Sequence, residues 1–220
     1  MSTSPPAEPR ALFLDYGGVL TGPVRDSFVA FEQATGIPPG RSFELLVEAS
    51  RIPGGGLIGA LERGEVTAAE FDAELAELLS SNGYQVPDGG LLDGLFAAMR
   101  PAGGLWDVVK QVRAHGLPTG LLSNSWGTTT YPREALEQHF DVLVISGEVG
   151  LRKPDPAIYR FACERIGLPP QRCAFVDDLV RNVEVAREVG MFAVVHEGDE
   201  EAVVAAISGF LELDLSVPGA

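Results

Sequence analysis

The sequence predicts an α/β fold, in which a parallel sheet carries helices on both faces and a helical segment is inserted near the N-terminus. From about residue 104, short β-rich apolar runs alternate with amphipathic helical patterns, which favours parallel strands joined by right-handed helical crossovers. Between about residues 24 and 98 apolar residues recur at three- and four-residue spacing without a strand-like run. That spacing indicates an insertion that is entirely helical.

The first expected strand is the run ALFL at residues 11–14, which ends at Asp15. Tyr16 follows, and then Gly17 and Gly18 interrupt the chain. An apolar run that stops at a lone carboxylate and two glycines is typical of a buried strand that enters a sharp loop. Because open parallel sheets bind ligands at the C-terminal ends of their strands, Asp15 is a candidate functional residue.

The helical insertion divides the chain into two predicted parts. Residues 10–22 and 100–213 form the sheet-containing core, and residues 23–99 form the insertion, with helical runs such as FVAFEQATG and TAAEFDAELAELL. Thr67 and Glu70 have the spacing of a capping box at the start of the second of these runs. The glycines at 54–56 predict a flexible break before it.

Polar residues follow the later strand-like runs TGLL, DVLVIS and CAFV. Because the C-terminal ends of parallel strands share one edge of a sheet, we expect them to meet Asp15 in one crevice. Each alone has an ordinary explanation as a turn residue or a surface charge, but two adjacent carboxylates repel unless a cation or donors hold them. The residues are Ser123, Asn124, Lys153, Asp177 and Asp178.

This set of residues fits phosphoryl transfer to a carboxylate. Asp15 is the expected nucleophile, which forms an aspartyl-phosphate that water then hydrolyses. The hard oxygens of Asp15, Asp177 and Asp178 suit Mg²⁺ as the cofactor. Lys153 is expected to neutralise the nucleophile and the transferred group. Ser123 and Asn124, with nearby backbone N–H groups, are expected to hold the phosphate together with that lysine.

Composition restricts the partners of the protein. Sixteen basic and 31 acidic residues give a formal net charge of −15, which argues against nucleic-acid binding and against adsorption to anionic membranes. No leader pattern or apolar run of about 18 residues occurs, so we expect a cytoplasmic protein, either a monomer or a homodimer. Cys163 and Cys173 fit no metal-binding spacing and are expected to be thiols at or near the core. The expected partner is a small phosphorylated substrate.

Four motifs carry a family resemblance: LFLDYGGVL, LLSNSW, GLRKPDPAIY and FVDDLVRNVEVAREVGM. In this order they resemble the haloacid dehalogenase superfamily of hydrolases, over residues 11 to about 196. Within it the sequence is most similar to the phosphatase domain of soluble epoxide hydrolase and to small bacterial sugar-phosphate phosphatases. The resemblance implies a Rossmann-like core and a helical cap, matching the insertion. It also implies a metal ligand from the backbone carbonyl of Gly17.

Gly17 departs from the pattern of this superfamily. Its typical phosphatases carry there a second Asp, which protonates the leaving group and then activates water. Losing a positioned general acid costs about 10²- to 10⁴-fold in rate. Three explanations are open: a substrate with a good leaving group, such as an anomeric or acyl phosphate; a substitute acid from the cap or the substrate; or weak or absent catalysis.

Two other functions compete with the Mg²⁺-dependent phosphohydrolase. A 2-haloacid dehalogenase uses the same nucleophile without metal, but the resemblance then implies a Tyr two positions after it, whereas here Tyr16 comes one position after. The other alternative is a catalytically weak or inactive protein that binds a phosphorylated metabolite or a partner, which only Gly17 favours. A magnesium requirement separates the phosphatase from the dehalogenase.

Overall fold

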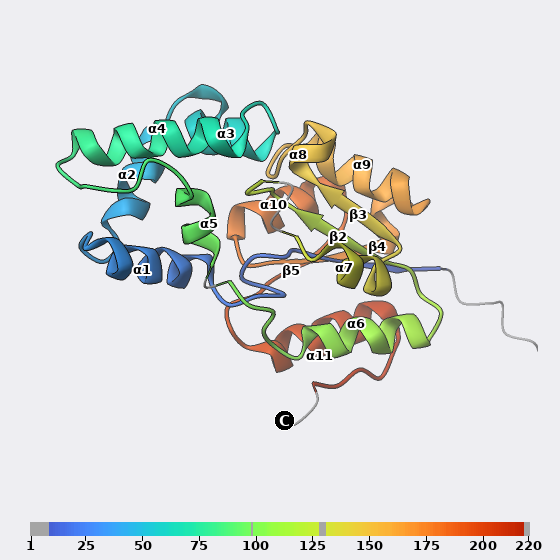
Figure 1. Cartoon of the computed structure of the whole chain (residues 1–220). Helices are drawn as coiled ribbons and strands as arrows, with labels where there is room; N and C mark the ends of the chain where they lie inside the picture. The colour runs from blue at the N-terminus through green and yellow to red at the C-terminus, as the bar shows by residue number, and fades with distance from the viewer. Residues whose placement is uncertain (1–8, 98, 128–130, 218–220) are drawn as a thin grey trace, which may run out of the picture.

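The computed structural model describes residues 9–97, 99–127 and 131–217 (Figure 1). Its centre is a five-stranded sheet in the order β3-β2-β1-β4-β5, and every pairing within it is parallel. The predicted α/β class with a parallel sheet is therefore confirmed. The strands are β1 (Ala11–Leu14), β2 (Thr119–Ser123), β3 (Val142–Ile145), β4 (Cys173–Asp177) and β5 (Phe192–Val195).

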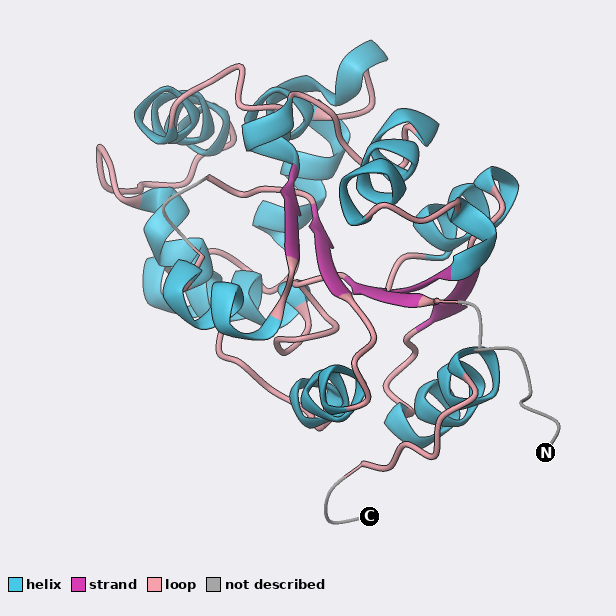
Figure 2. Ribbon diagram, turned by 90° about the vertical axis from the view of Figure 1, so that its right-hand side faces the viewer, coloured by secondary structure: helices cyan, strands magenta, loops and turns pink. Residues whose placement is uncertain are grey.

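Helices cover both faces of this sheet (Figure 2). The residues of β1 alternate between the two layers: Leu12 and Leu14 pack in one apolar cluster, and Ala11 and Phe13 pack in the other. Because both faces are covered, the central strand β1 is apolar along its whole length. The first layer contains α6 (Leu105–Ala114), α7 (Arg133–His139) and α11 (Glu200–Leu211), and the second contains α9 (Pro156–Ile166) and α10 (Val180–Val189).

Residues 24–97 fold as helices beside the sheet, and no strand occurs in this stretch of the described chain. They enclose an apolar cluster of their own, which includes Phe28, Leu46 and Phe71. This separate core supports the predicted division at residues 22/23 and 99/100, which stays a prediction. The helices are α1 (Val24–Thr35), α2 (Arg41–Ala49), α3 (Gly56–Glu62), α4 (Ala68–Ser81) and α5 (Leu91–Phe96), with the 3-10 turn Pro53–Gly55 before α3.

Two chain segments join this helical segment to the sheet, and they run side by side. Thr21 and Pro101 form an antiparallel bridge, and the backbone N–H of Ala102 donates to the carbonyl of Leu20 at 3.0 Å. The helical segment is therefore connected to the core through one narrow, paired junction that lies directly after the β1 loop.

Several local predictions are confirmed. Thr67 and Glu70 form a reciprocal capping box at the start of α4. Cys163 and Cys173 are buried free thiols. None of the helices in the described ranges is long and apolar enough to cross a membrane.

Candidate active site

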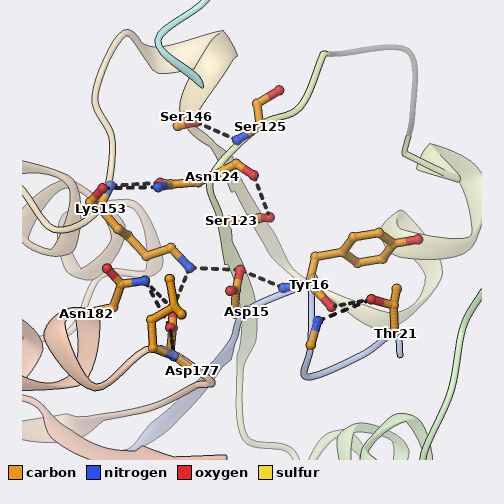
Figure 3. Close-up of polar contacts among 12 residues, drawn as sticks. Asp15, Tyr16, Thr21, Ser123, Asn124, Ser125, Ser146, Lys153, Asp177 and Asn182 are labelled. Carbon is orange, nitrogen blue, oxygen red and sulfur yellow. Dashed lines mark hydrogen bonds and ion pairs between the residues drawn. The ribbon is translucent and has the colours of Figure 1, made fainter. Parts of the chain in front are cut away.

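The polar residues predicted to meet do so at the C-terminal edge of the sheet (Figure 3). Most of them line one cavity of about 350 Å³ between the sheet and the helical segment; the predicted residues in its wall are Asp15, Gly17, Ser123, Asn124, Lys153 and Asp178. Asp177 does not line the cavity and is fully buried beneath it. The structure therefore brings together the four separate sequence segments that the shared-edge argument expected to meet.

Lys153 ties two of the carboxylates together. Its Nζ lies 2.8 Å from Oδ1 of Asp15 and 2.6 Å from Oδ2 of Asp177, and its side chain is 1% exposed. Burial opposes the ammonium charge, but the two neighbouring carboxylates outweigh burial and raise the pKa of Lys153 above its ordinary value. Lys153 is therefore a permanent positive charge beside Asp15.

The hydrogen bonds of Asp177 explain its buried position. Its Oδ1 accepts from the N–H of Leu179 at 2.8 Å and from Nδ2 of Asn182 at 2.9 Å, and its Oδ2 accepts from Lys153. Donors to both oxygens offset the cost of burying this carboxyl group. Asp177 thus anchors the lysine, and Asn182, one helical turn beyond Asp178, anchors Asp177.

The pKa values of Asp15 and Asp178 are raised in this crowded site. Burial, opposed by Lys153 and reinforced by Asp177, raises the pKa of Asp15 to about 7. Burial and Asp177 likewise raise the pKa of Asp178 to about 6. One carboxylate oxygen from each of Asp15, Asp177 and Asp178 lies within 4.8 Å of the others. Carboxylates this close together repel one another when they are all ionised. A divalent cation such as Mg²⁺, which prefers hard oxygen ligands, would offset that repulsion.

The loop after β1 can approach Asp178 closely because Gly18 has no side chain. Gly18 has φ +72°, and a Cβ at this position would collide with the Asp178 carboxylate. His196 fixes the loop, since its Nδ1 lies 3.0 Å from the Gly18 carbonyl oxygen. Gly17 differs: its φ is not in the left-handed region, and a Cβ there would lie 3.0 Å from a methyl carbon of Val24.

Ser123 ends β2 and Asn124 follows it, and their side chains have different contacts. The Ser123 hydroxyl is 2.8 Å from the Tyr131 hydroxyl, within the cavity wall. The Asn124 amide instead clamps the main chain of Lys153: its Oδ1 accepts from the lysine N–H at 2.8 Å and its Nδ2 donates to the lysine carbonyl at 3.0 Å. Asn124 therefore positions Lys153, which sequence spacing alone did not predict.

A family model described as a haloacid dehalogenase-like hydrolase matches residues 9–190. The chain belongs to the haloacid dehalogenase-like hydrolases. It is 30% identical to Acyl-CoA dehydrogenase family member 10 of Mus musculus over 227 residues, which cover 95% of this chain and 20% of that protein. It is 26% identical to Bifunctional epoxide hydrolase 2 of Mus musculus over 201 residues, which cover 84% of this chain and 36% of that protein. The chain thus spans well under half the length of these relatives.

Smaller relatives and solved structures agree with this membership. Phosphoserine phosphatase of Thermus thermophilus is 39% identical over 90 residues, which cover 38% of this chain and 35% of that protein. The structure of a HAD family enzyme from Bacteroides thetaiotaomicron, in complex with magnesium and inorganic phosphate, matches with a TM-score of 0.63 and 21% identity, covering 86% of this chain and 94% of the other. The latter match establishes the shared fold of this dehalogenase-like hydrolase.

The helical segment supplies the other side of the cavity in this hydrolase, which sequence reasoning did not assign. Its walls are mostly apolar; the residues are Val24, Phe43, Val47, Ile58 and Met99 from the helical segment, with Trp126 from the core. Among them stands one acidic side chain of the helical segment, Glu62, at the end of α3 and 5% exposed. Glu62 follows Ile58 by four residues, so helical spacing places both on the same face.

Proposed function

We propose that this dehalogenase-like hydrolase is a Mg²⁺-dependent phosphohydrolase that acts on a small phosphorylated metabolite through an aspartyl-phosphate. The observation that carries the proposal is the buried Asp15–Lys153 pair, with an Asp178 carboxylate oxygen within 4.8 Å of one from Asp15. A carboxylate held between an ammonium group and further carboxylates suits attack on phosphorus when a cation offsets the negative charge.

In the proposed reaction a carboxylate oxygen of Asp15 forms a bond to phosphorus while the bond from phosphorus to the leaving-group oxygen breaks. Lys153 stabilises the negative charge of the phosphoryl group as it moves toward Asp15. Water then attacks phosphorus, which frees Asp15 and releases inorganic phosphate. We assign to the helical segment at 23–99 the role of a cap that covers the cavity and excludes bulk water before phosphoryl transfer.

The carboxylates at the edge of the sheet fit Mg²⁺ as the cofactor. We assign Asp15, Asp178 and the backbone carbonyl of Gly17 as direct ligands. Asp177, whose oxygens already accept from Lys153, Asn182 and Leu179, completes the acidic set from below. When bound, the ion supplies positive charge that lets a carboxylate approach a phosphate.

Ser123 is the proposed ligand for a phosphate oxygen. Its hydroxyl now contacts the Tyr131 hydroxyl at 2.8 Å, so a bound phosphate oxygen can join or replace that contact. Burial raises the pKa of Tyr131, which keeps the phenol protonated and able to donate. Asn124 contributes by holding Lys153, and its own side chain is already bonded to the lysine main chain.

The relatives support a phosphatase over the other candidates. They include proteins named for phosphatase activity, and one similar structure holds magnesium and inorganic phosphate. A similar structure titled as a dehalogenase is 20% identical, and that match concerns the fold alone. The three grouped carboxylates favour a cation-dependent site over a metal-free dehalogenase. The mostly apolar cavity wall further favours a substrate with an apolar portion beside its phosphate.

The test is a screen of phosphorylated sugars, nucleotides, acyl phosphates and apolar phosphomonoesters, with Mg²⁺ and with a chelator, using the wild type and Asp15→Asn. We expect Mg²⁺-dependent release of phosphate that Asp15→Asn abolishes, because the nearly isosteric amide cannot act as the nucleophile. A melting curve should show that the variant is folded. Residual turnover above a few per cent removes Asp15 from this role, and full activity in chelator supports the dehalogenase instead.

A further inference from the structure

The cavity contains a carboxyl group that the proposed function does not use. Glu62 ends α3, in the helical segment, and faces the same cavity as Asp15, Gly17 and Lys153. The Gly17 position has no side chain to donate a proton, so an acid must come from elsewhere if a poor leaving group is to depart. We propose that Glu62 is the general acid and base of this hydrolase, supplied by the helical segment. This inference rests on the proposed phosphohydrolase function.

The backbone around Glu62 is fixed to the core, so that its carboxyl group is held in place. The Ser146 hydroxyl donates to the Glu62 carbonyl, and the same hydroxyl accepts from the N–H of Ser125 at 2.7 Å. Ser146 begins α8 (Ser146–Val149) directly after β3, and Ser125 follows the phosphate-binding end of β2. The helical segment and the core are thus joined at the point where Glu62 enters the site.

Arg152 fixes the side chain of Glu62 from the core. Its Nε lies 2.7 Å from Oε2 of Glu62, and its guanidinium lies so close to Gly55 that a Cβ there would collide with it. The glycines at 54–56 lie in the 3-10 turn and at the first residue of α3, and Gly55 leaves the space that Arg152 occupies. All three have positive φ. The second carboxyl oxygen, Oε1, is the atom we assign to proton transfer.

The surroundings of Glu62 allow it to carry a proton near neutral pH. Burial raises its pKa to about 7, against the opposing effects of Arg152, Lys153, the Asn124 side chain and Arg63. Tyr131 is the further titratable group that interacts with it. A general acid is most effective when its pKa lies near the working pH. Geometry places Glu62 in the cavity, and burial gives it a usable proton.

The proton balance of the proposed cycle is complete. In the first step Oε1 of protonated Glu62 gives its proton to the leaving-group oxygen, as the bond from that oxygen to phosphorus breaks and the Asp15 oxygen bonds to phosphorus. An alcohol leaves, and Glu62 becomes a carboxylate. In the second step this carboxylate takes one proton from water as the water oxygen attacks phosphorus. Hydrogen phosphate and the Asp15 carboxylate are released, and Glu62 is protonated again.

The test compares two probes of similar size, p-nitrophenyl phosphate and p-nitrobenzyl phosphate, with Mg²⁺ present. The phenolate of the first departs without protonation, whereas the alkoxide of the second requires a proton. We expect Glu62→Gln to lower kcat/KM for the benzyl ester by about 10²- to 10⁴-fold and to affect the phenyl ester far less. Glu65→Gln is the matched control, because Glu65 is an exposed carboxylate of the helical segment, paired with Arg63. Glu62→Asp should retain part of the benzyl-ester activity.

The pH profile separates proton donation from a merely structural role. For the benzyl ester, wild-type kcat/KM should fall as pH rises through about 7, where Glu62 loses its proton, and this limb should be absent in Glu62→Gln. Arg152→Gln removes a charge that lowers the pKa of Glu62, so the limb should move to higher pH. If Glu62→Gln does not fold, as a melting curve would show, an unmoved limb in Arg152→Gln overturns the proposal.

Equal losses on both esters, or no loss on either, also overturn the role of Glu62 while leaving the phosphohydrolase intact. A wild type with no Mg²⁺-dependent release of phosphate from either ester, and none from the wider screen, instead overturns the proposed function together with this inference. The two failures are therefore distinguishable.

Discussion

Nζ of Lys153 lies 2.8 Å from Oδ1 of Asp15, with both side chains buried at the end of β1. A lone buried carboxylate would take up a proton to escape its desolvation cost. The ammonium group opposes this effect of burial, which raises the pKa of Asp15 to about 7, and it favours the charged form that the proposed nucleophile requires. The same ammonium also neutralises Asp177, so Lys153 has a structural role that is separable from catalysis.

Replacing Lys153 should therefore lower stability as well as activity. Lys153→Met keeps an unbranched side chain of similar length but leaves two buried carboxylates without their cation. We expect the free energy of unfolding at pH 7 to fall by about 3–5 kcal/mol, measured by urea denaturation. The loss of stability should shrink at lower pH as Asp15, whose pKa burial raises to about 7, takes up a proton. Lys110→Met is the control, since Lys110 is 57% exposed; comparable losses in the two variants would contradict this account.

Magnesium should stabilise the folded protein if the acidic set binds it. At a free Mg²⁺ concentration of about 100 times Kd, the stabilisation is about 2.7 kcal/mol, visible as a rise in Tm. Asp178→Ala should largely remove both this rise and the heat of Mg²⁺ binding in calorimetry. The exposed Asp88→Ala is the control. Equal Mg²⁺ affinity in wild type and Asp178→Ala would show that Asp178 is not a ligand.

The sheet and the position of the site were predictable from sequence because both depend on local patterns. A strand buried on two faces is mostly apolar, as β1 and the first four residues of β4 are, and the end of such a run marks the edge of the sheet. Asp15, Ser123 and Asp178 could be placed together on this rule alone. It needs no knowledge of how the helices pack.

The remaining features depend on long-range packing, which periodicity does not encode. Glu62 reaches the cavity only because α3 docks on α8, through the contact between the Glu62 carbonyl and Ser146. The Asn124 amide looked like a phosphate ligand, but 29 residues further along the chain Lys153 offers it both a donor and an acceptor. The four-residue spacing of Ile58 and Glu62, which puts both on one face of a helix, was the sequence signal that could have pointed to Glu62 as the proposed acid.

The raised pKa of Glu62 also predicts how stability depends on pH. Below about pH 4.5 the group is protonated in both states. Between about 4.5 and 7 the unfolded chain releases the proton while the folded protein keeps it, so the folded state binds more protons and stability falls as pH rises. The shift corresponds to about 3 kcal/mol. Glu62→Gln should make this decline shallower in urea denaturation at a series of pH values, whereas Glu65→Gln should not.

The last prediction concerns Gly17, the position where the resemblance to the superfamily implies a second carboxylate. Gly17 lacks a positive φ, and a Cβ there would require only a small movement of Val24, so Gly17→Asp should fold. If Glu62 already serves as the acid, Gly17→Asp alone should change the p-nitrobenzyl phosphate rate little. In the Glu62→Gln background it should restore that rate by up to about 10²- to 10⁴-fold.

A new carboxylate beside the metal ligands could alter Mg²⁺ affinity without donating a proton, so Mg²⁺ titration and a melting curve accompany the kinetics of both Gly17→Asp variants. A large gain in the single variant, selective for the benzyl ester, would mean that the wild type lacks an acid and that Glu62 does not supply one. A metal-competent, folded double variant without any gain would mean that a carboxylate at position 17 cannot reach the leaving group. Recovery only in the Glu62→Gln background would show that a carboxyl group at position 17 and the Glu62 carboxyl group can each protonate the same departing oxygen.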